Sequence, residues 1–265
     1  MNKQLSVSMD QTNPLLSKVP EITIFFWITK LLTTGMGEVF SDYLSHQLDP
    51  VIAVALAGIG LVASLVLQFI VRRYVAWIYW LVVVMVSIFG TMAADAVHVV
   101  LGVPYLASTI FFVVALTLIF IIWYVSEKTL SIHSVFTRRR EFFYWATVLG
   151  TFALGTAAGD MTASTMHLGY FTSGVVFAIL LAIPAIGSWL FGLNKIFAFW
   201  FAYIMTRPVG ASFSDWIGAP QSSGGLGLGK GTVSLVLTIF IIILVGYLTV
   251  TRIDIKDESA TSQTR

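Results

Sequence analysis

The amino-acid sequence predicts an all-α protein that crosses a membrane eight times, with its helices arranged as four tandem two-helix repeats. Three observations predict this fold. First, 57% of the 265 residues are hydrophobic and only 11% are charged, whereas soluble domains average about 25% charged residues. Second, eight stretches approach the roughly 20 apolar residues that span a bilayer. Third, one motif of tryptophan, glycine and aspartate recurs in every second stretch.

The first four spans alternate between polar-striped and purely apolar sequence. We expect them at residues 22–45, 50–71, 74–100 and 104–126. The first carries Lys30 and Glu38, whereas the second and fourth have no charged residue in their interiors. The second ends before Arg72 and Arg73, and the fourth ends before Lys128, so basic residues separate each of them from the next span.

The last four spans repeat this alternation. We expect them at residues 141–166, 170–192, 195–217 and 232–251. The sixth contains Pro184, and the seventh contains Pro208 directly after Arg207. Proline removes a helical hydrogen bond, so we expect kinks there. The eighth comes after a glycine-rich loop, 222–232, which we interpret as a flexible external cap and not as a nucleotide-binding loop.

The spans form one membrane domain, 22–251, between a flexible tail at 1–21 and a second tail at 252–265. Most basic residues outside the spans lie in the two tails and in the loops after even-numbered spans, whereas the opposite loops hold only Lys230. Because basic loops stay on the cytoplasmic side, we expect a multi-pass protein of the bacterial inner membrane with both termini in the cytoplasm.

The odd-numbered spans, called motif helices below, share three positions without gaps. A glycine follows the tryptophan by ten residues, and an aspartate follows it by fifteen. The residues are Trp27, Trp80, Trp145 and Trp200; Gly37, Gly90, Gly155 and Gly210; and Asp42, Asp95, Asp160 and Asp215. We interpret the glycines as helix-packing positions and the tryptophans as an aromatic belt or packing set, with ligand stacking as the alternative.

Each repeat contains two spans, so all four repeats enter the membrane in the same direction and number about 22–73, 74–140, 141–194 and 195–251. The four aspartates are then expected at one depth near the outer surface. Parallel repeats are compatible with a pseudo-four-fold ring and also with two paired halves.

The segments KVPEITIFFWITKLLTTGMGEVFSDYL, TRPVGASFSDW and GGLGLGKGTVSLVL carry a more specific likeness. Through them the chain resembles, over nearly its whole length, a bacterial family of "membrane-anchored" proteins of unknown function with four tandem two-helix repeats. The resemblance implies the fold and the repeat number. It implies no activity.

Charged residues of the motif helices fall on one face. At 100° per residue, Lys30, Glu38, Arg207 and the four aspartates lie within an arc of about 120°. A charge facing lipid costs about 2.5–3.5 kcal/mol at the bilayer centre, so this face meets protein or water. Two positive and five negative charges leave a surplus, which favours a cation or proton site.

Three histidines lie near the outer ends of motif helices. His46 follows Asp42 by four residues, His98 follows Asp95 by three, and His167 follows Asp160 by two turns. Imidazole with carboxylate suits Mn²⁺, Zn²⁺, Ni²⁺ or Co²⁺, and it also suits proton relay. One interpretation of these histidines is metal ligation or proton relay, and the other is an ordinary position at the membrane interface.

These features favour a transporter or channel for a small solute, chiefly an inorganic divalent cation or a proton-coupled substrate. We expect that the protein is not an enzyme and has neither a resident cofactor nor a nucleic-acid partner. Its expected partners are the lipid bilayer and a small inorganic ion or solute, with a divalent metal ion as substrate. Two alternatives stay open: a haem- or quinone-binding redox subunit, and a non-catalytic scaffold or sensor.

Overall fold

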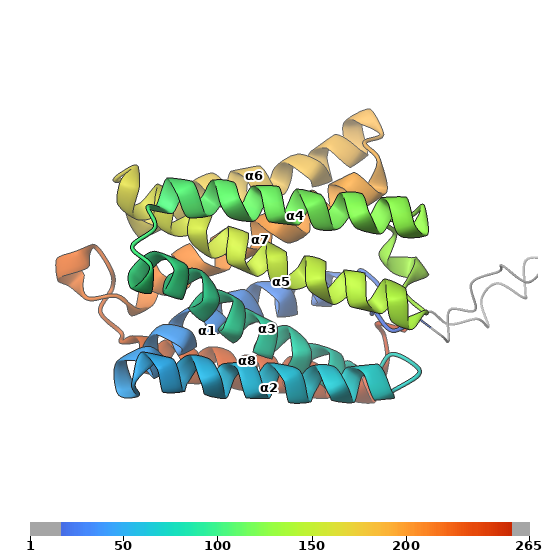
Figure 1. Ribbon diagram of the computed structural model, residues 1–265, viewed down its shortest axis with the longest axis horizontal. Helices are drawn as coiled ribbons and strands as arrows, with labels where there is room; N and C mark the ends of the chain where they lie inside the picture. Colours follow the sequence, from blue (N-terminus) through green and yellow to red (C-terminus); the bar gives the residue numbers. More distant parts are fainter. Residues whose placement is uncertain (1–16, 256–265) are drawn as a thin grey trace, which may run out of the picture.

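The computed structural model describes residues 17–255, and this part of the chain forms eight long helices (Figure 1). They are α1 (Ile24–Gln47), α2 (Pro50–Ile70), α3 (Ala76–Asp95), α4 (Tyr105–Glu127), α5 (Arg138–Asp160), α6 (Gly169–Phe191), α7 (Lys195–Gly218) and α8 (Lys230–Thr251). One-turn π-helices, η3 (Ala96–Val100) and η5 (Met161–Thr165), extend α3 and α5. Short 3₁₀ turns, η4 (Ile132–Ser134) and η6 (Gln221–Ser223), lie in loops.

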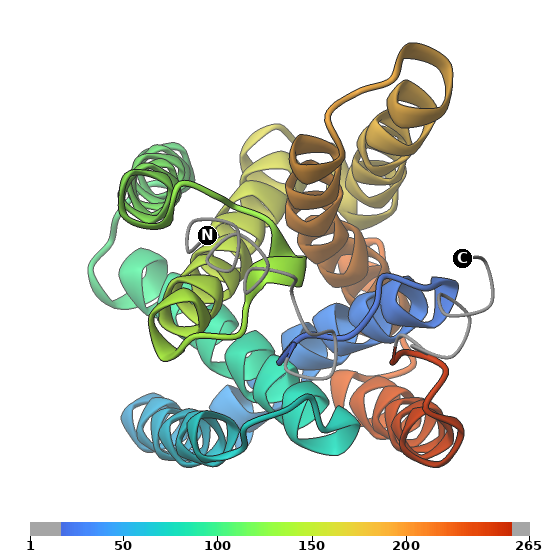
Figure 2. The same cartoon turned by 90° about the vertical axis from the view of Figure 1, so that its right-hand side faces the viewer.

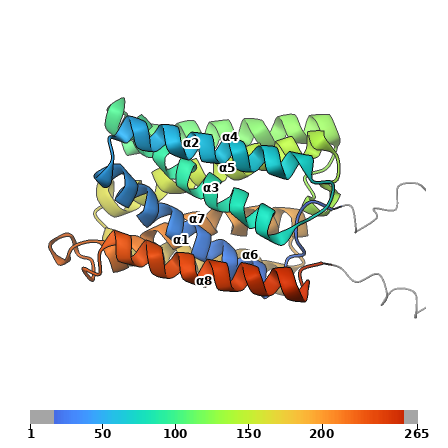
Figure 3. The same ribbon diagram turned by 90° about the horizontal axis from the view of Figure 1, so that it is seen from below.

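The four motif helices form an inner ring. α1 contacts α3, α3 contacts α5, α5 contacts α7, and α7 returns to α1 (Figure 2). Each even-numbered helix lies outside this ring, mainly against the motif helix that follows it: α2 on α3, α4 on α5 and α6 on α7. α8 packs on α1, as Figure 3 also shows, and this contact closes the circle. The repeats therefore form a ring and not two halves.

Membrane crossing follows from the length and composition of the helices. Six helices in the described part, α2, α3, α4, α5, α6 and α8, are long and apolar enough to cross a membrane by length and composition. α1 and α7 have 24 residues each but are more polar. They can be polar because they belong to the inner ring, where neighbouring helices separate their side chains from lipid. The protein is thus a membrane-spanning helical repeat protein.

The motif glycines allow neighbouring motif helices to pack closely against one another. Each one lies where a Cβ would collide with the side chain found seven residues after the tryptophan of the next repeat. At Gly90, for example, a Cβ would lie 2.9 Å from Cβ of Phe152. The four pairs are Gly37 with Ser87, Gly90 with Phe152, Gly155 with Arg207, and Gly210 with Thr34. Because the last pair joins the fourth repeat to the first, one packing rule runs round the whole ring.

We call the end of the ring next to residues 17 and 255 the terminal end. Aromatic side chains fill the interior of the ring there. Phe26, Tyr79, Tyr144 and Tyr203 come from the four motif helices and are almost completely buried. The hydroxyl oxygens of Tyr79 and Tyr144 lie 2.5 Å apart, and the ring centroids of Phe26 and Tyr203 are 6.4 Å apart. The axis of the ring is therefore packed at this end.

Both expected tails reach into the fold at the terminal end. Lys18 is buried, and its Nζ lies 2.5 Å from Oε2 of Glu141. The amide of Tyr74 donates to the carbonyl of Ser17, and the amide of Glu21 donates to the carbonyl of Asp254. Residues 17–21 and 252–255, which the sequence assigns to flexible tails, thus pack against the bundle. Residues 1–16 and 256–265 lie outside the described residues.

Candidate functional site

A cavity of about 710 Å³ opens at the end of the ring opposite to the terminal end, which we call the aspartate end. The motif aspartate of every repeat lines it, and so does Glu38 of α1. Asp42 and Asp215 lie on α1 and α7, whereas Asp95 and Asp160 are the last residues of α3 and α5. The fixed spacing from tryptophan to aspartate puts the four carboxyl groups at the same height on parallel helices. The ring then turns them into one cluster.

Two π-helical turns form part of the cavity wall. Both come directly after an aspartate, at η3 and at η5, and they contribute Ala96, Val97 and Ser164 to the lining. Such turns are rare in helices and often mark functional sites. Tyr105 and Tyr170, from the first turns of α4 and α6, also line the cavity.

Lys230 supplies a cation to this cluster. Its Nζ forms ion pairs with Oδ2 of Asp42 and, at 3.2 Å, with Oδ1 of Asp215. The sequence pattern predicts Lys230 in the external glycine-rich loop, whereas it is the first residue of α8 and reaches the cavity. The available signal is that Lys230 is the only basic residue in the loops on the side of the surplus carboxylates.

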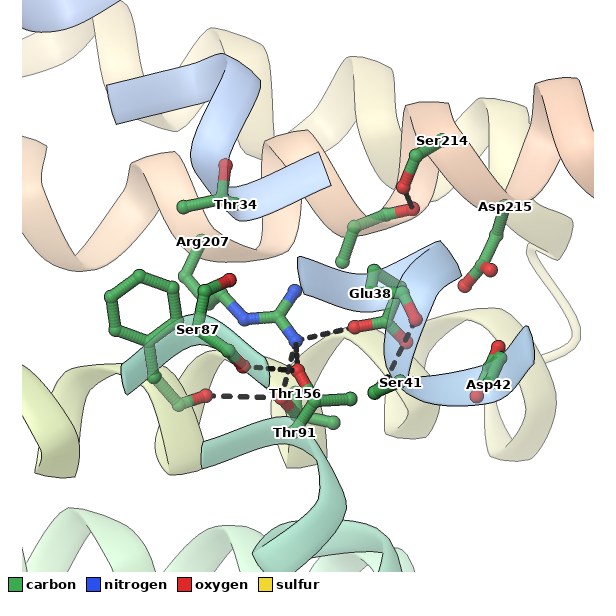
Figure 4. A network of polar contacts seen from close by, with 12 residues as sticks. Thr34, Glu38, Ser41, Asp42, Ser87, Thr91, Thr156, Arg207, Ser214 and Asp215 are labelled. Carbon is green, nitrogen blue, oxygen red and sulfur yellow. Dashed lines mark hydrogen bonds and ion pairs between the residues drawn. The ribbon is translucent and has the colours of Figure 1, made fainter. Parts of the chain in front are cut away.

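Arg207 lies behind Glu38, a residue of the cavity lining, and we call Arg207 and its partners the floor of the cavity. It is completely buried, and its Nη2 donates to Oε2 of Glu38 and to the hydroxyls of Thr91 and, at 2.7 Å, Thr156 (Figure 4). Glu38, Thr91 and Thr156 occupy the same motif position on α1, α3 and α5, eleven residues after the tryptophan. A single guanidinium nitrogen of α7 therefore joins all four motif helices.

The hydroxyl groups of both threonine partners are oriented by hydrogen bonds within their own helices. The hydroxyl of Thr91 donates to the carbonyl of Ser87, and that of Thr156 donates to the carbonyl of Phe152. Each hydroxyl therefore keeps its lone pairs for the guanidinium. In Figure 4, Asp42 and Asp215 lie beyond Glu38, on the side away from Arg207. Glu38 thus belongs both to the floor and to the cavity.

Lys30 lies apart from the carboxylates. It is buried, and its Nζ has no hydrogen-bond partner among the described residues. The ammonium lies 3.8 Å from the ring centroid of Phe152 and 4.1 Å from that of Tyr203. These are cation–π contacts. The helical angles place Lys30 and Arg207 on the charged face, but of these two cations only Arg207 pairs with a carboxylate among residues 17–255. The ring of Phe152 contacts both of them.

The three histidines do not meet at one site. His46 lines the cavity, with Nδ1 2.7 Å from the carbonyl oxygen of Asp42. His98 has Nδ1 2.6 Å from the carbonyl oxygen of Val103 and stacks on Tyr105. His167 is exposed at a left-handed backbone position. Among residues 17–255, the group whose ligand atoms all lie within 4.8 Å of one another is instead carboxylic: Glu38, Asp42 and Asp215.

The motif tryptophans lie at the terminal end and do not line the cavity. Trp80, Trp145 and Trp200 are buried in the aromatic cluster, and Trp27 is half-buried. The indole of Trp200 donates to the carbonyl of Leu130 at 2.9 Å. Their contacts are those of packing residues.

Comparison with known families agrees with the presence of four repeats. The model of the family "Repeat of Unknown Function (DUF347)" matches the chain four times, at residues 25–74, 78–129, 143–192 and 198–254. No curated protein and no solved structure matches the chain. The four matches cover most of the chain and confirm the resemblance stated from the sequence. The protein therefore belongs to the DUF347 family and carries four copies of its repeat.

Proposed function

We propose that this protein transports a small inorganic cation, chiefly a divalent one, across the membrane, and that the acidic cavity is the site where the cation enters. The observation that carries the proposal is the convergence of five carboxyl groups from four repeats in one cavity. A repeat whose only task was packing would not need a carboxyl group at the same cavity-lining position in each copy.

Charge supports this function. The cavity and its floor contain Glu38 and the four motif aspartates against two cations, Lys230 and Arg207. If all are ionised, three negative charges remain in a cavity with low-dielectric walls, and such a cavity concentrates cations from solution. Asp95 and Asp160 have no ion pair within residues 17–255, so they are the carboxylates most available to an entering ion.

The packing suggests one closed state of a transport cycle. The ring is hollow at the aspartate end, and the Arg207 floor and the aromatic cluster close it towards the terminal end. Passage of an ion would require movement of the motif helices, for which α7, with Pro208 next to Arg207, is the best candidate. No motif for nucleotide binding accompanies the fold, so we assign the driving force to an ion gradient or a proton gradient.

Orientation is part of the proposal. The connections at the terminal end hold Arg72, Arg73, Lys128 and Lys195, whereas the aspartate end has Lys230. By the distribution of basic residues, we place the terminal end in the cytoplasm of a bacterial inner membrane and the cavity on the outside. The redox alternative gains no support from the described residues, because the three histidines do not share one cavity.

Flux measurements test the proposal. The purified protein would be reconstituted in liposomes that contain a metal-sensitive dye, and the influx of Mn²⁺ would be compared with that in protein-free liposomes. We expect influx for the unmodified protein and its loss in Asp95→Asn combined with Asp160→Asn. Asp49→Asn is the matched control, since Asp49 is an exposed cap of α2 outside the cavity and asparagine also caps helices.

Full influx in the double variant would contradict the proposed role of the aspartates. Absence of influx of Mn²⁺, other divalent ions and protons with the unmodified protein would contradict transport of these ions altogether.

A further inference from the structure

Three carboxyl groups at the inner part of the cavity are arranged like the ligands of one ion. Oxygen atoms of Glu38, Asp42 and Asp215 all lie within 4.8 Å of one another, so one cation could reach all three. Asp215 is 5% exposed, and its Oδ1 accepts no hydrogen bond although Lys230 Nζ lies 3.2 Å away. A buried carboxylate oxygen without a hydrogen bond needs a cation beside it, and among the described residues the Lys230 ammonium is the cation in that place.

We propose that Glu38, Asp42 and Asp215 form a divalent-cation site and that the ammonium of Lys230 is a tethered competitor for it, displaced when the ion binds. This inference rests on the proposed function and adds to it a defined ligand set and a residue that sets selectivity. Carboxylate oxygens suit Mg²⁺, Ca²⁺ and Mn²⁺, which prefer oxygen ligands.

The charge balance favours a divalent over a monovalent ion. With Arg207 bound to Glu38, the three carboxylates keep two negative charges, and Lys230 neutralises one of them. A divalent ion in place of Lys230 neutralises both. A monovalent ion only substitutes one positive charge for another and gains nothing from the exchange. Lys230 therefore excludes Na⁺ and K⁺ more effectively than it excludes divalent ions.

The position of Lys230 allows its release. As the first residue of α8, its ammonium lies at the positive end of the helix dipole, where a cation is disfavoured. The loop before it contains Gly224, Gly227 and Gly229, all at positive φ. The side chain is about a quarter exposed, so the ammonium can move to water without unfolding the helix. The carboxylates hold Lys230 in place, and an ion that takes the carboxylates frees it.

Calorimetry with Mn²⁺ tests the proposal in detergent. If Lys230 occupies the site most of the time, then Lys230→Met should tighten Mn²⁺ binding by about tenfold or more, because the fraction of competent sites rises accordingly. Adding Asp215→Asn to Lys230→Met should remove the binding. Lys195→Met is the matched control: Lys195 is exposed and begins α7, as Lys230 begins α8, but lies at the terminal end. Unchanged or weaker binding in Lys230→Met would overturn the proposal.

A second measurement uses the unmodified protein and does not depend on how the variants fold. An amine-reactive ester would label the lysines with and without Mn²⁺, at equal ionic strength, and mass spectrometry would give the extent at each site. We expect Mn²⁺ to raise labelling of Lys230 severalfold and to leave Lys195 unchanged. Mn²⁺ binding with no change at Lys230 would overturn the competition.

The two proposals fail in different ways. Mn²⁺ influx into liposomes that Lys230→Met neither accelerates nor makes less selective against Na⁺ would refute the tethered competitor and retain the transporter. Lack of influx, together with tight Mn²⁺ binding that Lys230→Met enhances, would refute the transporter and retain the ion site.

Discussion

The ion pair between Arg207 and Glu38 should be the most costly polar contact of the ring to break from one side only. Both side chains are at least 95% buried. Removing one partner of such a pair costs about 3–5 kcal/mol, because the other charge stays buried without compensation. Arg207→Met leaves Glu38 in this condition, and Thr91 and Thr156 lose their donor, so we expect destabilisation in this range.

The companion variants separate the pair from its surroundings. Glu38→Gln keeps an acceptor for the guanidinium, so we expect a smaller loss of about 1–3 kcal/mol. The double variant, Arg207→Met with Glu38→Gln, buries no charge at this place and should cost less than the sum of the two single changes. The difference should be about 2–3 kcal/mol, at the upper end of couplings between residues in contact.

Unfolding in mixed micelles provides the assay. The free energy of unfolding would be measured by titrating sodium dodecyl sulfate and following tryptophan fluorescence, since Trp80, Trp145 and Trp200 are buried. Arg139→Met with Glu127→Gln is the matched control cycle, because Arg139 is 68% exposed and the coupling across such a solvent-screened pair is at most about 1 kcal/mol. Glu127 also pairs with Arg140, but the loss of that pair is common to Glu127→Gln and to the double change and cancels from the coupling. Additivity of the Arg207 and Glu38 changes within about 0.5 kcal/mol would refute the reasoning.

Three further predictions use the same unfolding assay. Gly90→Ala should cost about 1–3 kcal/mol by overpacking against the neighbouring motif helix. Gly246→Ala, where a Cβ meets nothing within 4 Å, should be neutral or stabilising by up to about 1 kcal/mol. Equal effects of the two changes would contradict the close packing of the motif glycines. Lys30→Met should raise stability, because it removes a buried ammonium without a hydrogen-bond partner; a clear loss would show that the cation–π contacts outweigh burial. Burial raises the pKa of Asp254, and the hydrogen bond from Tyr74 opposes this only in part. Between the ordinary aspartate pKa of about 4 and the raised pKa of the folded state, Asp254 is protonated in the folded protein and ionised in the unfolded chain. The free energy of unfolding should therefore fall as the pH rises through this range. Asp254→Asn should flatten this pH dependence.

Much of the fold could be predicted because its determinants are local. Span length reports bilayer thickness, and every helix end lies within three residues of its expected position when the π-helical turns are counted with α3 and α5. The common spacing of Trp27 and Asp42, and of the other three pairs, sets one height for all four aspartates, since each residue advances a helix by a fixed rise. The gathering of the aspartates at one end results from this and from the parallel direction of the repeats.

The partners of the charged residues could not be predicted in the same way. Helical angles put Lys30 and Arg207 on one face, but the angle of a residue does not say which side chain of a neighbouring helix lies opposite. In the ring, Arg207 meets Glu38 because the two helices adjoin and the heights match, whereas Lys30 meets the aromatic rings of Phe152 and Tyr203. Lys230 could not be assigned to the site from sequence, because its reach depends on where the loop returns α8 to the bundle.

Residue composition and the period of a single helix are enough to predict a membrane-spanning chain of four tandem repeats, the ends of its helices and the common depth of its carboxyl groups. Packing between helices sets the rest: the repeats close into a ring, each motif glycine receives a side chain of the next repeat, and Lys230 shares the site with Asp42 and Asp215. Such contacts join residues up to 188 positions apart. Their pairing depends on how whole helices pack, and no local pattern along the chain encodes that.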